Sequence, residues 1–205
     1  MKAIIGTKLG CTSIYSEEGV QIPVTVVEAG PNYVTHIKTE ESDGYDSVQL
    51  AYAEKKEKNT SKAMQGHFKK SGVAPKKKLK EFRDYEIEVS LGDAVECDIF
   101  EEGEIVNVAG ISKGKGFQGV VKRHGFAGVG DATHGQHNRQ RAPGAIGMAS
   151  TPSRVFKGMI MAGRTGGERV TVKNLMVAKV LKDKNILMIK GAIPGPKGSM
   201  VIVQN

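Results

Sequence analysis

The stretch Ser112–Gly125, SKGKGFQGVVKRHG, and its continuation Thr133–Gly147, THGQHNRQRAPGAIG, decide the organisation of this 205-residue chain. Both are rich in glycine, basic residues and histidine, and neither contains an acidic residue. Such a segment cannot bury enough apolar surface to offset the entropy that it loses on ordering. We therefore expect it to take one shape only against another molecule, and we expect the core to lie elsewhere in the chain.

The whole region 112–168 lacks a sustained helical or strand period. An irregular segment of that length inside a compact domain is usually either functional or disordered. A flexible, solvated loop is the plain alternative, but a pure linker would consist of glycine and serine. Apolar residues are interleaved here instead, namely Phe117, Val120, Val121, Phe126, Ile146, Val155, Phe156, Met159 and Met161. This pattern favours a binding role.

Charge is segregated along the sequence. Residues 54–83 hold eleven Lys/Arg against three Asp/Glu, residues 84–109 hold none against nine, and residues 110–169 hold ten against two. The whole chain has a formal net charge of +8. Two basic blocks separated by an acidic one indicate a surface that meets a polyanion, and glycine with arginine in the second block favours RNA.

Strands are predicted near both ends of the chain. Residues 20–29, 32–39, 45–53, 169–181, 185–193 and 199–205 are β-branched and partly alternating, and two short acidic strands are expected at 85–89 and 94–100. This predicts a mainly β protein: a small antiparallel β-barrel formed by residues 1–111 and 169–205, with residues 112–168 as a long irregular extension. The expected core residues are Ile22, Val24, Val26, Val106, Val108, Val170, Val172, Ile186, Met188, Val201 and Val203.

A basic helical insertion is expected at about residues 55–83. The run NTSKAMQGHFKK reads as one helix, capped by Asn59 or Thr60, and KKKLKEFRD reads as a second helix after Pro75. Its surface faces either RNA or solvent, and eleven basic residues exceed what solubility requires. The acidic block that follows is expected to face solvent or a basic neighbouring protein.

Several classes of protein are disfavoured. Cys11 and Cys97 have no CxxC or Cys/His metal spacing, which argues against a disulfide scaffold or a zinc site. The start MKAIIGTKLGC lacks the features of a signal peptide, and no apolar run approaches the ~20 residues that span a bilayer. We expect a cytoplasmic protein with no membrane partner.

The run FEEGEIVNVAGISKGKGFQGVVKR, Phe100–Arg123, resembles the signature of the ribosomal protein L3 (uL3) family, bacterial type. The residues at the family's spacing are Phe100, Asn107, Gly110, Ser112, Gly114, Lys115, Gly116, Gly119 and Arg123. IGTKLGCT, PVTVVEAGP, RAPGAIG, VFKGMIMAG and KGAIPGPKG also match, in the same order. The resemblance covers essentially the whole chain.

The resemblance implies a structural constituent of the large ribosomal subunit that has no enzymatic activity. It implies binding to 23S rRNA early in assembly, with no cofactor and no small-molecule substrate. It also implies a β-barrel domain at the subunit surface, an extension that threads toward the peptidyl transferase centre, and the neighbouring proteins L14 and L19. The interpretation from charge and pattern alone extends only to a barrel and an RNA-bound extension.

The chain departs from the family pattern at two places. Many bacterial relatives carry a glutamine that becomes N5-methylated at the position of Met148, and a thioether has no amide to modify. Met159 and Ile160 stand where relatives often have lysines, so those phosphate contacts are in doubt.

Given this resemblance, we assign the basic residues of the extension to phosphate contacts, which position a protein on RNA without reading bases. They are Lys113, Lys115, Lys122, Arg123, Arg139, Arg141, Arg154, Lys157 and Arg164. His124, His134 and His137 are expected to stack on bases or to hydrogen-bond to RNA. A catalytic or metal role for the histidines is the alternative, but Asp131 is the nearby carboxylate and no Cys or Glu completes a zinc set. A free RNA chaperone or assembly factor is a further alternative.

Overall fold

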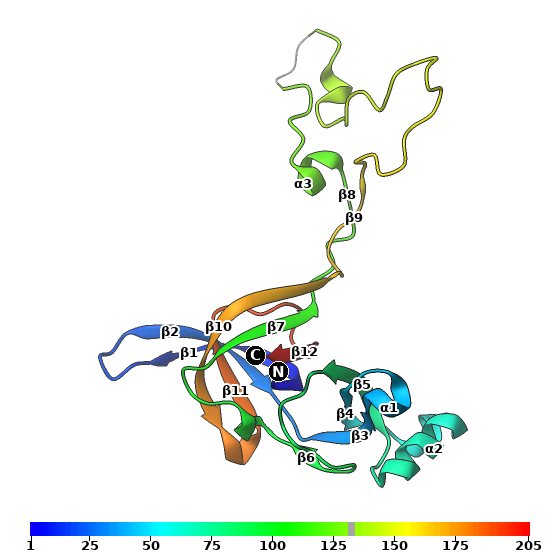
Figure 1. Ribbon diagram of the computed structural model, residues 1–205. Coiled ribbons are helices and arrows are strands. Elements are labelled where there is room, and N and C mark those ends of the chain that lie inside the picture. Colours follow the sequence, from blue (N-terminus) through cyan, green and yellow to red (C-terminus); the bar gives the residue numbers. More distant parts are fainter. Residues whose placement is uncertain (131–133) are drawn as a thin grey trace. The chain divides into compact units, whose positions relative to one another are not determined.

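The computed structural model describes residues 1–130 and 134–205, so Asp131 and Thr133 lie outside the described residues. The chain divides into two compact units (Figure 1). Unit 1 comprises Met1–Ile111 and Arg169–Asn205, and unit 2 comprises Ser112–Glu168. The predicted mainly β character is confirmed, because strands form most of the regular structure.

The first sheet of unit 1 is a closed, antiparallel barrel in the order β1–β12–β7–β10–β11–β2. Its strands are β1 (Ala3–Tyr15), β2 (Gln21–Glu28), β7 (Ile105–Ile111), β10 (Arg169–Leu181), β11 (Ile186–Lys190) and β12 (Met200–Gln204). The first and last strands of the chain pair directly, with Ala3 opposite Gln204. Closure satisfies the backbone hydrogen bonds that an open sheet would leave at its edges.

The second sheet has the order β5–β4–β3–β6 and is antiparallel throughout. It comprises β3 (Asn32–Lys38), β4 (Ser47–Glu54), β5 (Lys76–Arg83) and β6 (Ala94–Val95). Short helices connect its strands: α1 (Glu40–Asp43), η1 (Glu57–Asn59), α2 (Lys62–Ser71) and, after β6, η2 (Cys97–Ile99). In the barrel, η4 (Lys182–Lys184) and Asn185, in the left-handed region at φ 51°, form the turn between β10 and β11.

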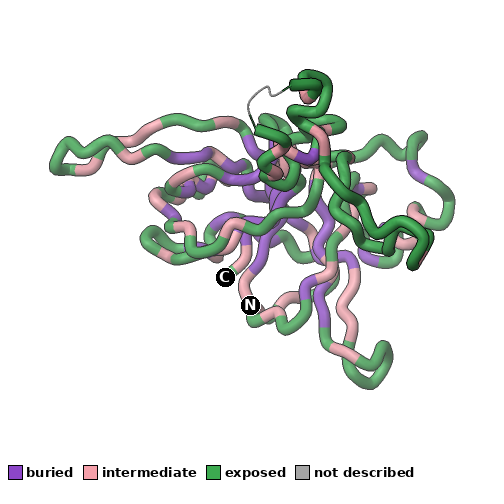
Figure 2. The backbone as a smooth tube through the Cα atoms, turned by 90° about the horizontal axis from the view of Figure 1, so that it is seen from above, coloured by how far each residue is buried: buried purple, intermediate pink, exposed green. Residues whose placement is uncertain are grey.

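Both sheets share one core, whose buried stretches are marked in Figure 2. Among the expected core residues, Val24, Val106, Val108, Val201 and Val203 are buried. Five others are only partly buried: Ile22, Val26, Val172, Ile186 and Met188. Val170 is 41% exposed, so its expected place in the core was wrong. On β11 the buried residues are Leu187 and Ile189, because successive strand residues face opposite sides and the core takes the odd positions.

The expected second basic helix, KKKLKEFRD, is wrong: residues 76–83 form strand β5. Lysine, leucine and glutamate favour helices in isolation, but tertiary pairing overrides that preference. Here β5 pairs with β4 over its whole length and buries Phe82 opposite Val48. The first helix is present as α2, although it follows Ser61 and not the predicted caps Asn59 or Thr60.

The acidic strand expected at 85–89 is also wrong, since no regular element covers these residues. Tyr85 and Val89 instead pack against the shared core from an irregular segment. The strand expected at 94–100 is confined to the two residues of β6. Over the described residues, no helix has the length and apolar character required to cross a membrane.

Candidate nucleic-acid interface

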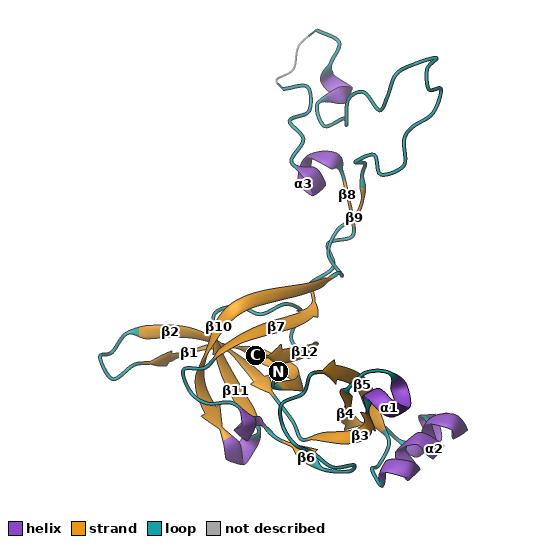
Figure 3. Cartoon of the chain, viewed as in Figure 1, coloured by secondary structure: helices purple, strands orange, loops and turns teal. Residues whose placement is uncertain are grey.

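Unit 2 begins and ends in a short antiparallel stem. The Ser112 amide donates to the Glu168 carbonyl at 2.9 Å, and the Lys115 amide donates to the Thr165 carbonyl at the same distance. Beyond these bonds, β8 (Phe117–Gln118) pairs with β9 (Gly163–Arg164). Figure 3 shows that the rest of unit 2 is mostly loop, with α3 (Val120–His124) and η3 (His137–Arg139) as short helical turns.

Glycine allows backbone segments of unit 2 to approach closely. Gly166 lies at φ +71°, and a Cβ there would be 2.1 Å from the carbonyl oxygen of Lys113. Gly128 lies at φ +74°, and its Cβ would be 2.0 Å from the carbonyl oxygen of Gln140. Neither position accepts a side chain without displacement of the backbone. At these glycines, backbone packs directly against backbone in unit 2, whereas buried side chains form the core of unit 1.

The helical turn α3 is tied to the returning chain. Arg123 Nη1 donates to the Met161 carbonyl at 2.7 Å, and His124 Nε2 lies 3.1 Å from the same oxygen. Val120 is buried at the start of the turn, and Gly125 ends it in the left-handed region. Arg123 and His124, which the sequence predicts to contact RNA, therefore each also have a contact inside unit 2.

The structure places all twelve predicted site residues on the surface of unit 2. Lys113 and Lys115 lie in the stem, Lys122 lies on α3, and Arg164 lies in β9. The others lie at or near η3 or in the following loop: His134, His137, Arg139, Arg141, Arg154 and Lys157. Their amine, guanidinium and imidazole groups are consequently accessible to a partner.

The positive charge of unit 2 is not balanced internally. Its sequence has nine Lys/Arg against Asp131 and Glu168. Within the part of the chain that the structure describes, none of the nine forms an ion pair, since the three ion pairs all lie in unit 1. Cations that are exposed and unpaired attract a polyanion over distances of about a Debye length.

Large apolar side chains are exposed beside these cations. Phe117 is 76% exposed, Met148 is 80% exposed and Phe156 is 54% exposed. The Arg154 guanidinium lies over the Phe156 ring, 5.5 Å from its centroid, which creates a mixed cationic and aromatic surface. Nucleic acids offer both phosphates for the cations and base faces for the apolar groups.

The histidines of the described residues do not form a metal-binding cluster. No group of three or more His, Cys, Asp or Glu side chains is close enough to hold a metal ion there. His124 is engaged by Met161 and packs against Phe126, with ring centroids 6.1 Å apart. Asp131, the nearby carboxylate in the sequence, falls outside the described residues.

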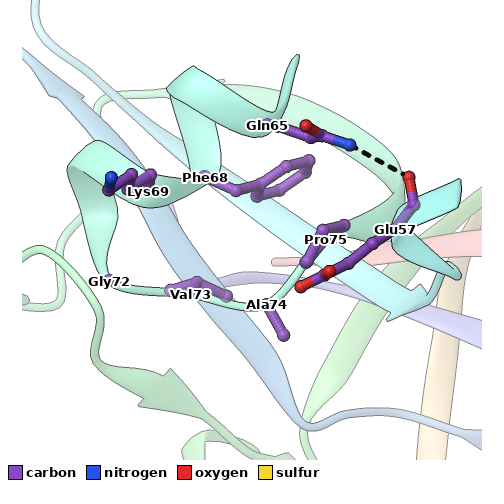
Figure 4. A pocket seen from close by; sticks show the side chains of 8 residues that line it. All are labelled: Glu57, Gln65, Phe68, Lys69, Gly72, Val73, Ala74 and Pro75. Atoms are coloured by element: carbon purple, nitrogen blue, oxygen red, sulfur yellow. Dashed lines mark hydrogen bonds between the residues drawn. The ribbon is translucent and has the colours of Figure 1, made fainter. Parts of the chain in front are cut away.

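A cavity of about 410 Å³ lies beside α2 in the basic insertion of unit 1 (Figure 4). Phe68 and Pro75 form apolar parts of its lining, and Gln65 Nε2 donates to the Glu57 carbonyl at 3.1 Å across it. The charged residues of the lining are Lys69 and Glu57, so their charges cancel. This cavity therefore has no electrostatic preference for an anion.

Comparisons with known proteins agree on one family. The family model described as ribosomal protein L3 matches residues 91–185. A curated protein of Salinibacter ruber, named large ribosomal subunit protein uL3, is 56% identical over 199 residues. The similarity covers 97% of this chain and 96% of that relative.

Proposed function

Because the chain belongs to the ribosomal protein L3 family, we propose that it is a structural constituent of the large ribosomal subunit that binds 23S rRNA. The observation that carries the rRNA-binding proposal is the surface of unit 2. All twelve candidate residues are exposed there, and its nine Lys/Arg form no ion pair within the described chain.

The proposed mechanism is electrostatic and geometric. Lys and Arg side chains neutralise rRNA phosphates and release condensed counterions, which makes binding favourable and dependent on salt. Arginine matches phosphate oxygens with a planar fork, while lysine supplies a point charge. The glycines bring the backbone close to RNA, and the exposed aromatic and thioether groups pack against bases. His124, His134 and His137 bind RNA in this scheme and transfer no protons to a substrate.

Unit 2 acts as the extension that penetrates rRNA and reaches toward the peptidyl transferase centre, while the barrel of unit 1 lies at the subunit surface. The protein joins the subunit early in assembly in the cytoplasm, beside L14 and L19. It needs no cofactor and has no enzymatic activity, and it affects peptidyl transfer only by holding nearby rRNA in position.

Co-sedimentation of the tagged chain with ribosomal particles in a high-salt gradient tests this function. Stoichiometric recovery with the large subunit is the expected result. Recovery with precursor particles alone, or release by salt, would indicate an assembly factor and overturn the proposal. Hydrolytic or transferase turnover that is lost in His134→Ala and His137→Ala would indicate an enzyme.

A further inference from the structure

A groove lies beside β5 in unit 1, between the second sheet and the barrel. Two cavities of about 180 and 310 Å³ form it, and both are lined by Ile111 and Met200. Strand β5 stands at the end of its sheet and pairs with β4 alone among the described strands. We call this feature the β5 groove.

The charged residues that line the β5 groove are all cationic. Lys78 and Lys77 line the larger cavity, and Lys80 and Arg169 line the smaller one, with no Asp or Glu in either lining. The nearest carboxylate on β5, Glu81, pairs with Lys38 at 3.2 Å. Within the described residues, Lys78, Lys80 and Arg169 form no ion pair.

The direction of these lysines is the unusual feature. Alternate residues of a strand face the same side, so Lys78 and Lys80 share a face with Phe82, which is buried in the core. That face of an amphipathic strand is normally apolar. Lys78 and Lys80 lie on it but remain exposed to solvent, so both ammonium groups are accessible to an anion that enters the carboxylate-free groove.

The floor of the groove is apolar. Ile111 is 51% exposed at the end of β7, Met200 is partly exposed at the start of β12, and Ile202 lies beside them. A simple inorganic anion would gain nothing from such a floor. A nucleotide strand carries phosphates for the cations and base faces for the apolar side chains.

We propose that the β5 groove binds a strand of RNA, with phosphates at Lys78, Lys80 and Arg169 and a base against Ile111 and Met200. This proposal rests on the proposed function, because it assigns a second RNA contact to a protein that binds rRNA through unit 2. No local motif singles out Arg169, and the helical composition of residues 76–83 does not predict that Lys78 and Lys80 share one face of a strand.

The test compares two variants of the full chain that lose the same charge. Lys78→Gln/Lys80→Gln alters the groove, whereas Lys182→Gln/Lys184→Gln alters two exposed lysines of η4 with the same spacing. Binding to a full-length 23S rRNA transcript is measured at several salt concentrations. We expect the groove variant to bind roughly tenfold more weakly than the control, with a salt slope lower by about two.

A second measurement does not depend on affinity. The wild-type chain is cross-linked by ultraviolet light to a 23S rRNA transcript that contains 4-thiouridine, and the attached peptides are identified by mass spectrometry. We expect nucleotides on the peptides that contain Lys78 or Met200. Urea unfolding of both variants, with equal midpoints, shows that the substitutions leave the fold intact.

The outcomes separate the two proposals. Suppose that the wild-type chain binds 23S rRNA more tightly than other RNAs. If the two double variants then bind 23S rRNA with equal affinity, and no nucleotide is cross-linked to the groove peptides, the groove proposal is wrong. If the groove variant also self-associates, Lys78 and Lys80 instead protect the open edge of β5 from pairing with a strand of another molecule. Failure of wild type to prefer 23S rRNA contradicts the function itself.

Discussion

Arg123 and Met161 are 38 residues apart in the sequence, yet Arg123 Nη1 donates to the Met161 carbonyl at 2.7 Å. The bond joins α3 to the irregular segment that leads into β9. A guanidinium has five N–H donors, so the remaining donors stay available for phosphate oxygens. One side chain thereby combines an internal contact with a place on the candidate RNA surface.

Arg123→Ala is expected to weaken rRNA binding at every salt concentration and to lower the salt slope by about one, because one phosphate contact is lost. Arg123→Lys is the matched control: it retains the charge and therefore the slope, but it lacks the planar fork. Filter binding to 23S rRNA across a salt series measures both. An unchanged slope in Arg123→Ala removes Arg123 from the phosphate contacts.

Gly166→Ala is expected to disrupt the stem of unit 2, because its Cβ would lie 2.1 Å from the Lys113 carbonyl oxygen. Gly158→Ala is the control, since Gly158 also has a positive φ, +86°, but a Cβ there meets nothing within 4 Å. Hydrogen exchange of the Ser112 and Lys115 amides reports on the stem. Faster exchange is expected in Gly166→Ala only, and equal exchange in both variants would contradict this account.

Asn32→Ala is expected to lower the free energy of unfolding by roughly 2–4 kcal/mol, because buried backbone groups lose their partner. The Asn32 side chain is fully buried, accepts from the Ile5 amide at 3.3 Å and donates to the Ile5 carbonyl at 2.9 Å. Urea denaturation measures the loss. Asn59→Ala, at an exposed side chain of the same unit, is the control and is expected to change stability by less than about 0.5 kcal/mol.

Burial raises the pKa of the Tyr85 phenol to about 12. The folded state thus favours the neutral phenol, whose hydroxyl donates to the Ala3 carbonyl at 3.1 Å. This contribution to stability is complete below pH 10 and is lost as the pH rises from 10 to about 12. Burial also raises the pKa of the Tyr52 phenol, so two tyrosines ionise late. Phenolate absorbance should show a late rise that is smaller in Tyr85→Phe and unchanged in Tyr15→Phe; an unchanged late rise in Tyr85→Phe would contradict the assignment.

Much of unit 1 is predictable because its strands carry their pattern locally. The β-branched alternation of residues 20–29 and 199–205 identifies β2 and β12 without tertiary information. Strand β1 has no such pattern, because Gly6, Lys8 and Gly10 interrupt it. Gly6 allows β2 to approach β1 closely, because a Cβ at Gly6 would lie 2.6 Å from the carbonyl oxygen of Glu28 in β2.

Other features depend on partners distant in the sequence. Strand β5 has a helical composition and becomes a strand because Leu79 and Phe82 pair opposite Ala51 and Val48. In unit 2 the cations are evident from the sequence, since charge and exposure follow from composition. The contact of Arg123 with Met161 is not, because nothing local to either residue indicates it.

The pairing of β1 with β12 has a consequence for biosynthesis. Ala3 pairs with Gln204, so the barrel cannot close until residues 200–204 of β12 have left the exit tunnel. The pairing of β7 with β10 likewise spans all of unit 2, which is translated before its second anchoring strand exists. Contacts between segments so distant in the sequence form slowly. The nascent chain therefore carries the cationic unit 2 before the barrel of unit 1 has formed.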